Sequence, residues 1–204
     1  MQKLFWAANT ISSASAIALN EGGVHWEGVE IDFSSAEQTK PEYMAINPKG
    51  RVPALSTPEG ILTETGAILE YIAATMVPAL VPADPLQAAR MRELMYYITT
   101  TIHVNHAHRM RGYRWARMES SFEDMRSMVT ENMVAGCAFL EERIAGPYFF
   151  GETLTLAECW VYPVLRFLPG DGVDISDYPK LAALQAAMEA RPSVRAILDM
   201  GLVR

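Results

Sequence analysis

The sequence predicts an α+β protein of two domains: a βαβαββα domain over residues 1–76 and an all-helical bundle over residues 85–204, joined by a linker over residues 77–84. Short apolar runs of strand length alternate with helical patterns only in the first part of the chain. Pro78, Pro82 and Pro85 then interrupt both patterns. Beyond them, apolar residues recur only at helical spacing, which predicts a domain without strands.

The first domain's elements follow from branched and aromatic residues, which favour strands, and from glycine and proline, which end helices. Gly22-Gly23 and Asn47-Pro48 mark two such ends, and the turn over residues 57–60 makes the last two strands a hairpin. The predicted strands are Lys3–Trp6, Val24–Ile31, Val52–Ser56 and Ile61–Thr63, and the predicted helices are Ser13–Asn20, Pro41–Ile46 and Glu64–Met76.

The second domain is predicted from helical periodicity and one capping motif. Apolar residues recur every three or four positions over 91–102 and again over 129–144. Thr155 and Glu158 fit a capping box, so a third helix is expected to start there and to bend or end near Pro163. Two further helices are expected over Asp177–Met188 and Ser193–Met200.

Composition limits the classes of protein. Half of the residues are apolar, and the net charge of −7 argues against a general nucleic-acid surface. The two cysteines, Cys137 and Cys159, are too few for a disulfide framework and suit a reducing compartment. The chain shows neither a signal-peptide pattern nor an apolar run that could cross a membrane. We therefore expect a cytoplasmic protein.

The segment Asn47–Leu55, which reads NPKGRVPAL, has the features of a peptide-binding device. Val52 precedes Pro53, and only X-Pro bonds adopt the cis form at a cost of about 0.5 to 1 kcal/mol. A cis bond would leave the Val52 backbone free to pair with an extended ligand. Glu64 and Thr65 follow at a predicted helix start, where a ligand carboxylate and ammonium could bind. The alternatives are an ordinary trans turn and a helix N-cap at Thr63 or Thr65.

Joined in this order, these pieces resemble the glutathione S-transferase superfamily, especially the bacterial enzymes related to its beta class. The resemblance implies a thioredoxin-like first domain followed by a helical second domain. It also implies that Val52, before a cis Pro53, pairs with the cysteinyl backbone of glutathione, while Glu64 and Thr65 bind its γ-glutamyl end. Lys49 and Arg51 lie within this segment. Either is a candidate to contact the glutathione backbone or its glycine carboxylate, with Arg51 preferred as the neighbour of Val52, and the alternative is that both are loop charges.

Enzymes of this superfamily activate glutathione with a hydroxyl or thiol donor near the end of the first strand, because the thiolate is the nucleophile. Alignment to the beta class places Ile11 where the resemblance implies a cysteine, so cysteine-based thiol exchange is not expected. Ser12 is the first choice as donor. Asn9, Thr10 and Ser13 are further candidates, and an N-cap role for Ser12 or Ser13 is the alternative.

A second cluster lies within the helical domain. By the same resemblance His103 matches a histidine that faces the co-substrate, and His106 shares its helix face. Arg111 belongs to a run of four arginines. These either form a basic wall near the glutathione carboxylate or an acidic co-substrate, or form a solvated helix face. A zinc site needs three or four converging ligands, and His108 falls elsewhere, so no metal is expected.

The sequence therefore predicts a homodimeric glutathione S-transferase that acts on a small hydrophobic or acidic electrophile, with no nucleic-acid or membrane partner. A catalytically silent binding or regulatory member of the same fold is the alternative. A thioredoxin-type disulfide reductase is excluded because the chain has no C-x-x-C pair. Transfer, isomerisation, dehalogenation and peroxide reduction are not distinguished by the sequence.

Overall fold

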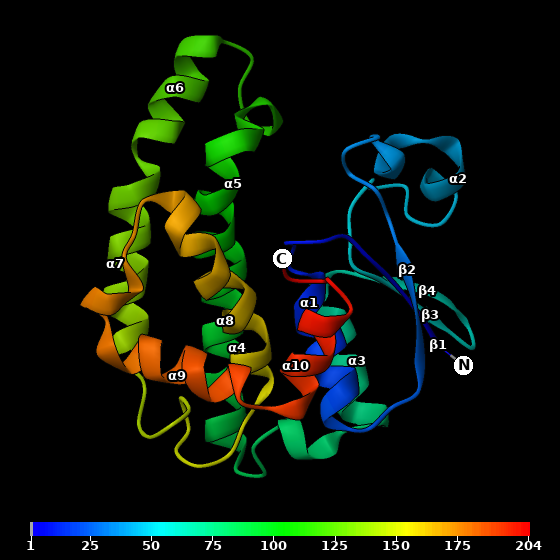
Figure 1. The fold of residues 1–204 in the computed structure, drawn as a ribbon, viewed down its shortest axis with the longest axis vertical. Helices are drawn as coiled ribbons and strands as arrows, with labels where there is room; N and C mark the ends of the chain where they lie inside the picture. The colour runs from blue at the N-terminus through cyan, green and yellow to red at the C-terminus, as the bar shows by residue number, and fades with distance from the viewer. Residues whose placement is uncertain (1) are drawn as a thin grey trace. The chain divides into compact units, whose positions relative to one another are not determined.

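The computed structural model describes residues 2–204 and divides into two compact units. The first unit combines the chain up to Ala83 with the C-terminal segment Met188–Arg204, and the second spans Asp84–Ala187. The sequence prediction placed the last 17 residues in the helical domain, whereas the structure packs them with the N-terminal unit. The element order is visible in Figure 1.

The first unit has the expected βαβαββα order. Its elements are β1 (Gln2–Trp6), α1 (Ser12–Glu21), β2 (Trp26–Glu30), η1 (Glu37–Thr39), α2 (Pro41–Met44), β3 (Ala54–Thr57), β4 (Gly60–Thr63), α3 (Thr65–Thr75), η2 (Pro78–Leu80) and, from the end of the chain, α10 (Pro192–Asp199). The four strands form one sheet in the order β2-β1-β3-β4, with β1 parallel to β2 and the other pairs antiparallel. This mixed sheet is the thioredoxin-like arrangement predicted from the sequence.

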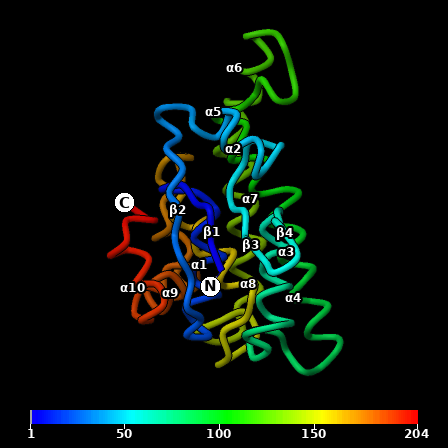
Figure 2. Tube along the Cα trace, turned by 90° about the vertical axis from the view of Figure 1, so that its right-hand side faces the viewer, coloured from blue at the N-terminus to red at the C-terminus, as the bar shows by residue number. Residues whose placement is uncertain are grey.

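Helices α1, α3 and α10 pack together beside this sheet. Figure 2 follows the same elements from the side. The core between them is aliphatic, and Leu4, Ile17, Leu55, Ile68 and Ile72 are fully buried. Full burial of such side chains contributes roughly 1.5 to 3 kcal/mol each, so the sheet and α1 form a rigid base for the loops at their ends.

The second unit is helical, as predicted. It contains α4 (Pro85–Tyr97), a π-helical turn η3 (Ile98–Ile102), α5 (His103–Arg111), η4 (Gly112–Arg114), α6 (Glu119–Ser127), α7 (Val129–Glu141), α8 (Leu156–Phe167), η5 (Leu168–Asp171), η6 (Ile175–Asp177) and α9 (Pro179–Glu189). Helix α8 is the most buried helix of this unit, with its residues from Leu156 to Leu165 all buried.

Three details of the helical unit differ from the sequence prediction. The pattern over 91–102 predicted a single helix, but a π-helical turn joins α4 to α5 there. Helix α6 was missed because none of its residues is buried, which leaves no apolar periodicity to detect. Helix α8 does not end at Pro163 but continues to Phe167.

The capping box at the start of α8 is confirmed. The Thr155 hydroxyl accepts from the Ala157 amide at 3.2 Å, and the Glu158 carboxylate accepts from the Thr155 amide at 2.7 Å. Glu158 also accepts from the Phe149 amide, 2.8 Å away. Burial raises the pKa of Glu158, although these hydrogen bonds oppose the shift.

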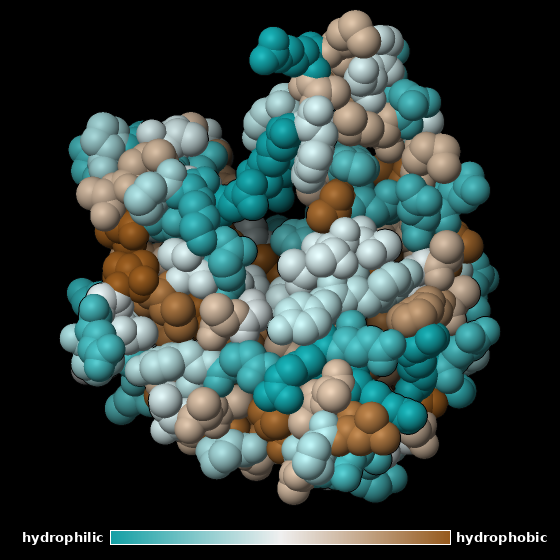
Figure 3. All heavy atoms as spheres, turned by 180° about the vertical axis from the view of Figure 1, so that it is seen from behind, coloured by the Kyte–Doolittle hydropathy of each residue, from teal (hydrophilic) through white to brown (hydrophobic). Residues whose placement is uncertain are grey.

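The surface mixes polar and apolar residues. On the face drawn in Figure 3, hydrophobic residues lie in small groups among hydrophilic ones. Among residues 2–204, no helix is both long and apolar enough to span a bilayer.

Candidate functional site

The predicted glutathione-binding segment follows α2 and leads into β3. The Val52–Pro53 peptide bond is cis. Val52 lies outside β3, and no hydrogen bond to its backbone is found within residues 2–204. Its N–H and C=O can therefore pair with an extended ligand in the manner of an added strand.

Two side chains fix the residue before Val52. The Tyr43 hydroxyl donates to the Arg51 carbonyl at 2.7 Å, and the Asn47 amide donates to the same oxygen at 2.6 Å. Burial raises the pKa of Tyr43 to about 12, against the opposing effect of the Asn47 side chain, so the phenol remains a donor at neutral pH. Sequence reasoning missed Tyr43, whose only signal was an aromatic residue in the short helix before Asn47-Pro48.

The loop between Asn47 and Val52 depends on one glycine. Gly50 has a φ of 60°, a conformation that favours glycine, and its amide donates to the Asn47 carbonyl at 2.9 Å. A Cβ at this position would also lie 3.1 Å from the backbone oxygen of Gln38. The NPKG sequence is therefore matched to the turn that brings Arg51 and Val52 to the start of β3.

Glu64 and Thr65 lie together at the start of α3. Glu64 is the N-cap residue, with φ 72° and no capping side-chain bond, so the alternative of a Thr63 or Thr65 cap is wrong. Thr65 is buried, and the first amides of α3 lack intrahelical partners, as at any helix N-terminus. These groups are suited to bind a carboxylate.

Of the two basic side chains near Val52, one is already ion-paired and the other is not. The Lys49 ammonium lies 2.6 Å from the Glu64 carboxylate and 2.7 Å from the Thr63 hydroxyl. Arg51 is exposed, and its guanidinium has no ion-pair partner among residues 2–204. The Arg51 side chain is thus available for a ligand carboxylate, whereas Lys49 already pairs with Glu64.

The predicted thiol-activating loop lies between β1 and α1. The Thr10 hydroxyl donates its only proton to the Ala7 carbonyl at 2.7 Å, so in its 2.9 Å contact with Ser12 it accepts, and the Ser12 hydroxyl donates. The Ser13 hydroxyl donates to the Thr10 carbonyl at 3.1 Å. Both serines are buried, and each has committed its proton within the loop.

The alternative assignment of Ser12 or Ser13 as the N-cap of α1 is wrong. The N-cap is Ile11, which makes no side-chain capping bond. Ile11 is buried, so the position that aligns with the beta-class cysteine faces the interior.

Asn9 differs from the serines because it keeps donors free. It adopts φ 54°, which asparagine tolerates better than most residues. Its backbone N–H donates to the Leu202 carbonyl at 2.9 Å, and its side-chain oxygen accepts from the backbone N–H of Arg204 at 2.8 Å. Because the side-chain oxygen of Asn9 accepts this hydrogen bond, the other end of the side chain is the NH₂ group. Asn9 is exposed, so this NH₂ group can donate to a ligand.

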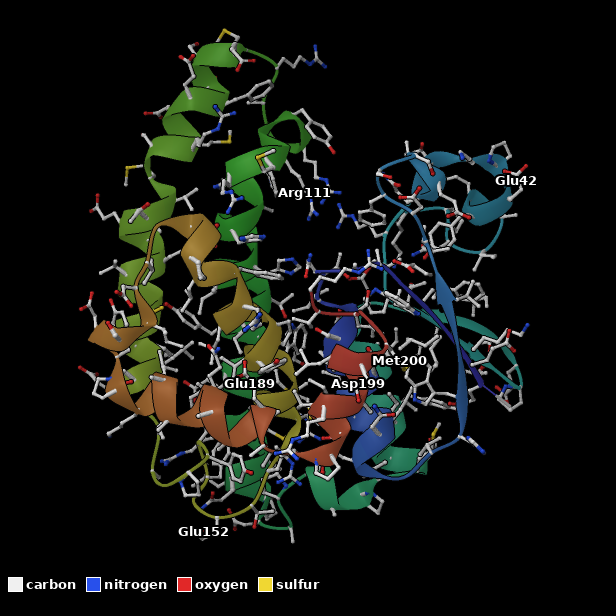
Figure 4. The ribbon with its side chains drawn as sticks, viewed as in Figure 1. Glu42, Arg111, Glu152, Glu189, Asp199 and Met200 are labelled. Carbon is white, nitrogen blue, oxygen red and sulfur yellow. The ribbon has the colours of Figure 1, made fainter. Side chains whose placement is uncertain are left out.

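The predicted co-substrate residues lie on α5 in the helical unit. The rings of His103 and His106 are 6.3 Å apart, as expected for one helix face, while His108 contacts Trp115 edge to face at 4.7 Å. Figure 4 shows Arg111 at the C-terminal end of the same helix. Among residues 2–204, no group of three side chains that could hold a metal ion occurs.

His106 also contacts a carboxylate that sequence reasoning missed. Its Nδ1 lies 2.7 Å from Oδ2 of Asp171, and Arg109 lies 3.4 Å from the other oxygen. The signal for this residue is an aspartate between two glycines, Gly170 and Gly172, directly after an apolar helix.

Comparisons with known proteins identify the family of this chain. Residues 3–74 match the family model of the glutathione S-transferase N-terminal domain, and residues 108–199 match that of the glutathione S-transferase C-terminal domain. The chain is 31% identical to a maleylpyruvate isomerase from Ralstonia, covering 90% of this chain and 89% of that protein. It is 32% identical to a glutathione S-transferase from Pseudomonas putida, covering 89% and 84%.

A solved structure of a glutathione transferase homologue from Sulfitobacter, with bound glutathione, superposes with a TM-score of 0.96. It is 50% identical to this chain, and the match covers 99% of both chains. Domain models, full-length relatives and fold thus agree, and this chain belongs to the glutathione S-transferase family.

Proposed function

We propose that this protein binds glutathione on its N-terminal unit and activates the thiolate for attack on a small apolar or acidic co-substrate. The carrying observation is the unpaired Val52 backbone, held by Tyr43 and Asn47, near the start of α3 with Glu64 and Thr65. Val52 would pair with the cysteinyl backbone of glutathione. Thr65 and the α3 amides would bind the γ-glutamyl carboxylate.

Glu64 would bind the ammonium group of the γ-glutamyl residue. In the structure its carboxylate lies 2.6 Å from the Lys49 ammonium, which carries the same positive charge as the ligand's ammonium group. Both side chains are about half exposed, so this pair contributes little and can rearrange. Arg51 would then meet the glycine carboxylate.

The thiolate donor we propose is the side-chain NH₂ group of Asn9, with the first amides of α1 beside it. Ser12 and Ser13, also candidates from the sequence, would have to release their present hydrogen bonds before donating to sulfur. Because the Ser12 and Ser13 hydroxyls already donate within the loop, a second candidate function is a catalytically silent member that binds glutathione without lowering its thiol pKa.

The co-substrate site is proposed on α5, at His103, His106 and Arg111. Four large apolar side chains near the end of this helix are exposed, and arginines alternate with them: Met110, Tyr113, Trp115 and Met118. This mixture suits a small molecule with an apolar body and an acidic group. The Ralstonia relative, a maleylpyruvate isomerase, makes isomerisation of an acidic substrate a reaction to test beside transfer.

Calorimetry with glutathione tests the binding half of this proposal. Glu64→Gln should weaken glutathione binding about tenfold, which is 1.4 kcal/mol. Glu59→Gln is the matched control, because it removes the same charge from the exposed β3–β4 turn. Absence of binding heat with the unmodified protein would refute the proposal, and binding without a lowered thiol pKa would support the silent alternative.

We also propose that the protein is a cytoplasmic homodimer. Its two cysteines, Cys137 and Cys159, are free and buried, which suits a reducing compartment. Sedimentation equilibrium should give the mass of two chains, and fractionation of the source cells should recover the protein with cytoplasmic markers.

A further inference from the structure

Asp171 is a buried carboxylate directed at one nitrogen of His106. Its side chain is fully inaccessible, and its two oxygens lie 3.0 and 2.7 Å from Nδ1 of His106. Arg109 adds a weaker contact, with Nη1 at 3.4 Å from Oδ1. A buried charge is costly unless it is paired, so these two partners account for the presence of Asp171 in the interior.

The chain around Asp171 is shaped to present this carboxylate. A Cβ on Gly170 would lie 2.0 Å from Nη1 of Arg109, so a larger residue would displace the guanidinium from its present position. Gly172 has φ 78°, which ends η5 immediately after the aspartate. The Thr130 hydroxyl of α7 donates to the Asp171 carbonyl at 2.8 Å and fixes its backbone.

The ring of His106 is held by stacking as well as by its hydrogen bond to Asp171. It stacks on Phe167 at a centroid distance of 4.2 Å and an interplanar angle of 14°. Because a carboxylate only accepts, Nδ1 of the neutral ring must carry the proton and donate it to Asp171. Nε2 is then the acceptor nitrogen, on a side chain that remains 20% exposed.

We propose that Asp171 is a positioning residue that holds His106 in the Nδ1–H tautomer. Nε2 thereby becomes a hydrogen-bond acceptor for a co-substrate that carries a hydroxyl or enol donor. This deepens the proposed function, on which it rests, by naming a chemical group of the co-substrate. Arg109 supports the arrangement by orienting the same carboxylate.

Nitrogen-15 NMR of the histidine side chains tests the tautomer without any substrate. In the unmodified protein, recorded on the alkaline side of the imidazole titration, Nδ1 of His106 should be protonated and Nε2 unprotonated. A protonated Nε2 would overturn the proposal. This measurement needs no variant, so it stands even if substitutions at Asp171 impair folding.

Asp171→Asn should reverse the tautomer. A guanidinium only donates, so Arg109 would bind the side-chain oxygen of the new asparagine. The NH₂ group of the asparagine would then face His106 and donate to Nδ1. Nε2 would become a donor. Asp174→Asn is the matched control, since it removes the same charge three residues away, where the exposed side chain accepts from Ser176 and not from a histidine. An unchanged spectrum for Asp171→Asn would refute the positioning role.

Kinetics test the acceptor role with two aldehydes, hydroxynonenal and nonenal, which differ by one hydroxyl group. Because a hydroxyl can also accept from a reversed ring, the variant used is His106→Phe, which removes Nε2 altogether. It should lower kcat/KM for glutathione addition to hydroxynonenal by about tenfold, while the value for nonenal changes little. Equal losses for both aldehydes would overturn the acceptor role. Calorimetric binding of glutathione to the unmodified protein and to His106→Phe separates a failure of the acceptor role from a failure of the proposed function.

Discussion

At the scale of single residues, hydrogen-bond direction decides which groups can act. Ser12 and Asn9 both lie in the loop before α1 and both can donate to sulfur in principle. The Ser12 proton is committed because Thr10 gives its own proton to Ala7, whereas the Asn9 NH₂ group has no partner among residues 2–204. Residue type alone could not separate them.

The first prediction compares these two residues. Asn9→Gly, which keeps the positive φ without strain, should raise the pKa of enzyme-bound glutathione. Ser12→Ala should change that pKa less, because its hydroxyl faces Thr10. Thiolate absorbance titrations of the two variants measure this, and a larger rise for Ser12→Ala would return the serine to the donor role.

The second prediction concerns Cys137 on α7. Burial raises the pKa of its thiol to about 12, with the negative charges of Asp171 and Glu141 adding to the effect. At pH 8 only about one thiol in ten thousand is then ionised. Iodoacetamide should therefore label Cys137 very slowly in the folded protein and quickly in guanidinium. Mass spectrometry of tryptic peptides would show this, and rapid labelling of the folded protein would contradict it.

At the scale of elements, α1 is held by a contact from the far end of the chain. Arg191, the N-cap of α10, binds Glu21 at the end of α1 through Nε and Nη2, each 2.6 Å from a carboxylate oxygen. Ser193 donates to the same carboxylate through a short hydrogen bond. These contacts fix the helix whose N-terminus carries the Asn9 loop.

Glu21→Gln should lower the free energy of unfolding by about 2 kcal/mol at neutral pH, since it removes charge-assisted hydrogen bonds. Burial alone would raise the pKa of Glu21, but Arg191 and Ser193 lower it overall. The stabilisation is therefore present above the unfolded pKa and is lost as the pH falls through the lower folded pKa. Urea unfolding at several pH values should show the difference from the unmodified protein shrinking below about pH 4.

The start of α8 gives a second test at this scale. Glu158→Ala would leave the amides of Phe149 and Thr155 and the Thr155 hydroxyl without their acceptor. A loss of about 3 kcal/mol is expected from buried unsatisfied donors. Glu152→Ala, in the exposed loop before the helix (Figure 4), is the control and should cost little. Similar unfolding midpoints for both variants would contradict this account.

At the scale of the whole molecule, the two ends of the chain meet at the loop that carries Asn9. Asn9 is bonded to Leu202 and Arg204, which are nearly the whole sequence away. The N-terminal unit therefore includes residues that follow the helical unit in the chain.

Deleting residues 201–204 should consequently raise the thiol pKa of bound glutathione, because Asn9 would lose both backbone partners and its orientation. Arg204→Ala is the matched control: it removes the side chain that pairs with Glu30 at the surface but keeps the backbone amide that binds Asn9. Absorbance titration compares the two. Equal thiol pKa values in the deletion and the unmodified protein would show that the end contacts are not needed.

The sequence by itself determined the fold class and the family, and it indicated the segment that we propose binds glutathione. These depend on local features that a reader of the chain can see: periodicity, proline and glycine positions, the Val52-Pro53 pair and the Glu64-Thr65 helix start. The capping box at Thr155 was predictable for the same reason.

Only the tertiary structure decided which side chains are free to act. The engagement of Ser12, the support of Arg51 by Tyr43, and the pairing of His106 with Asp171 depend on burial and on partners distant in sequence. The position of the last residues against α1 is of the same kind. Hydrogen-bond direction and proton commitment are properties of three-dimensional neighbours, so no pattern along the chain encodes them.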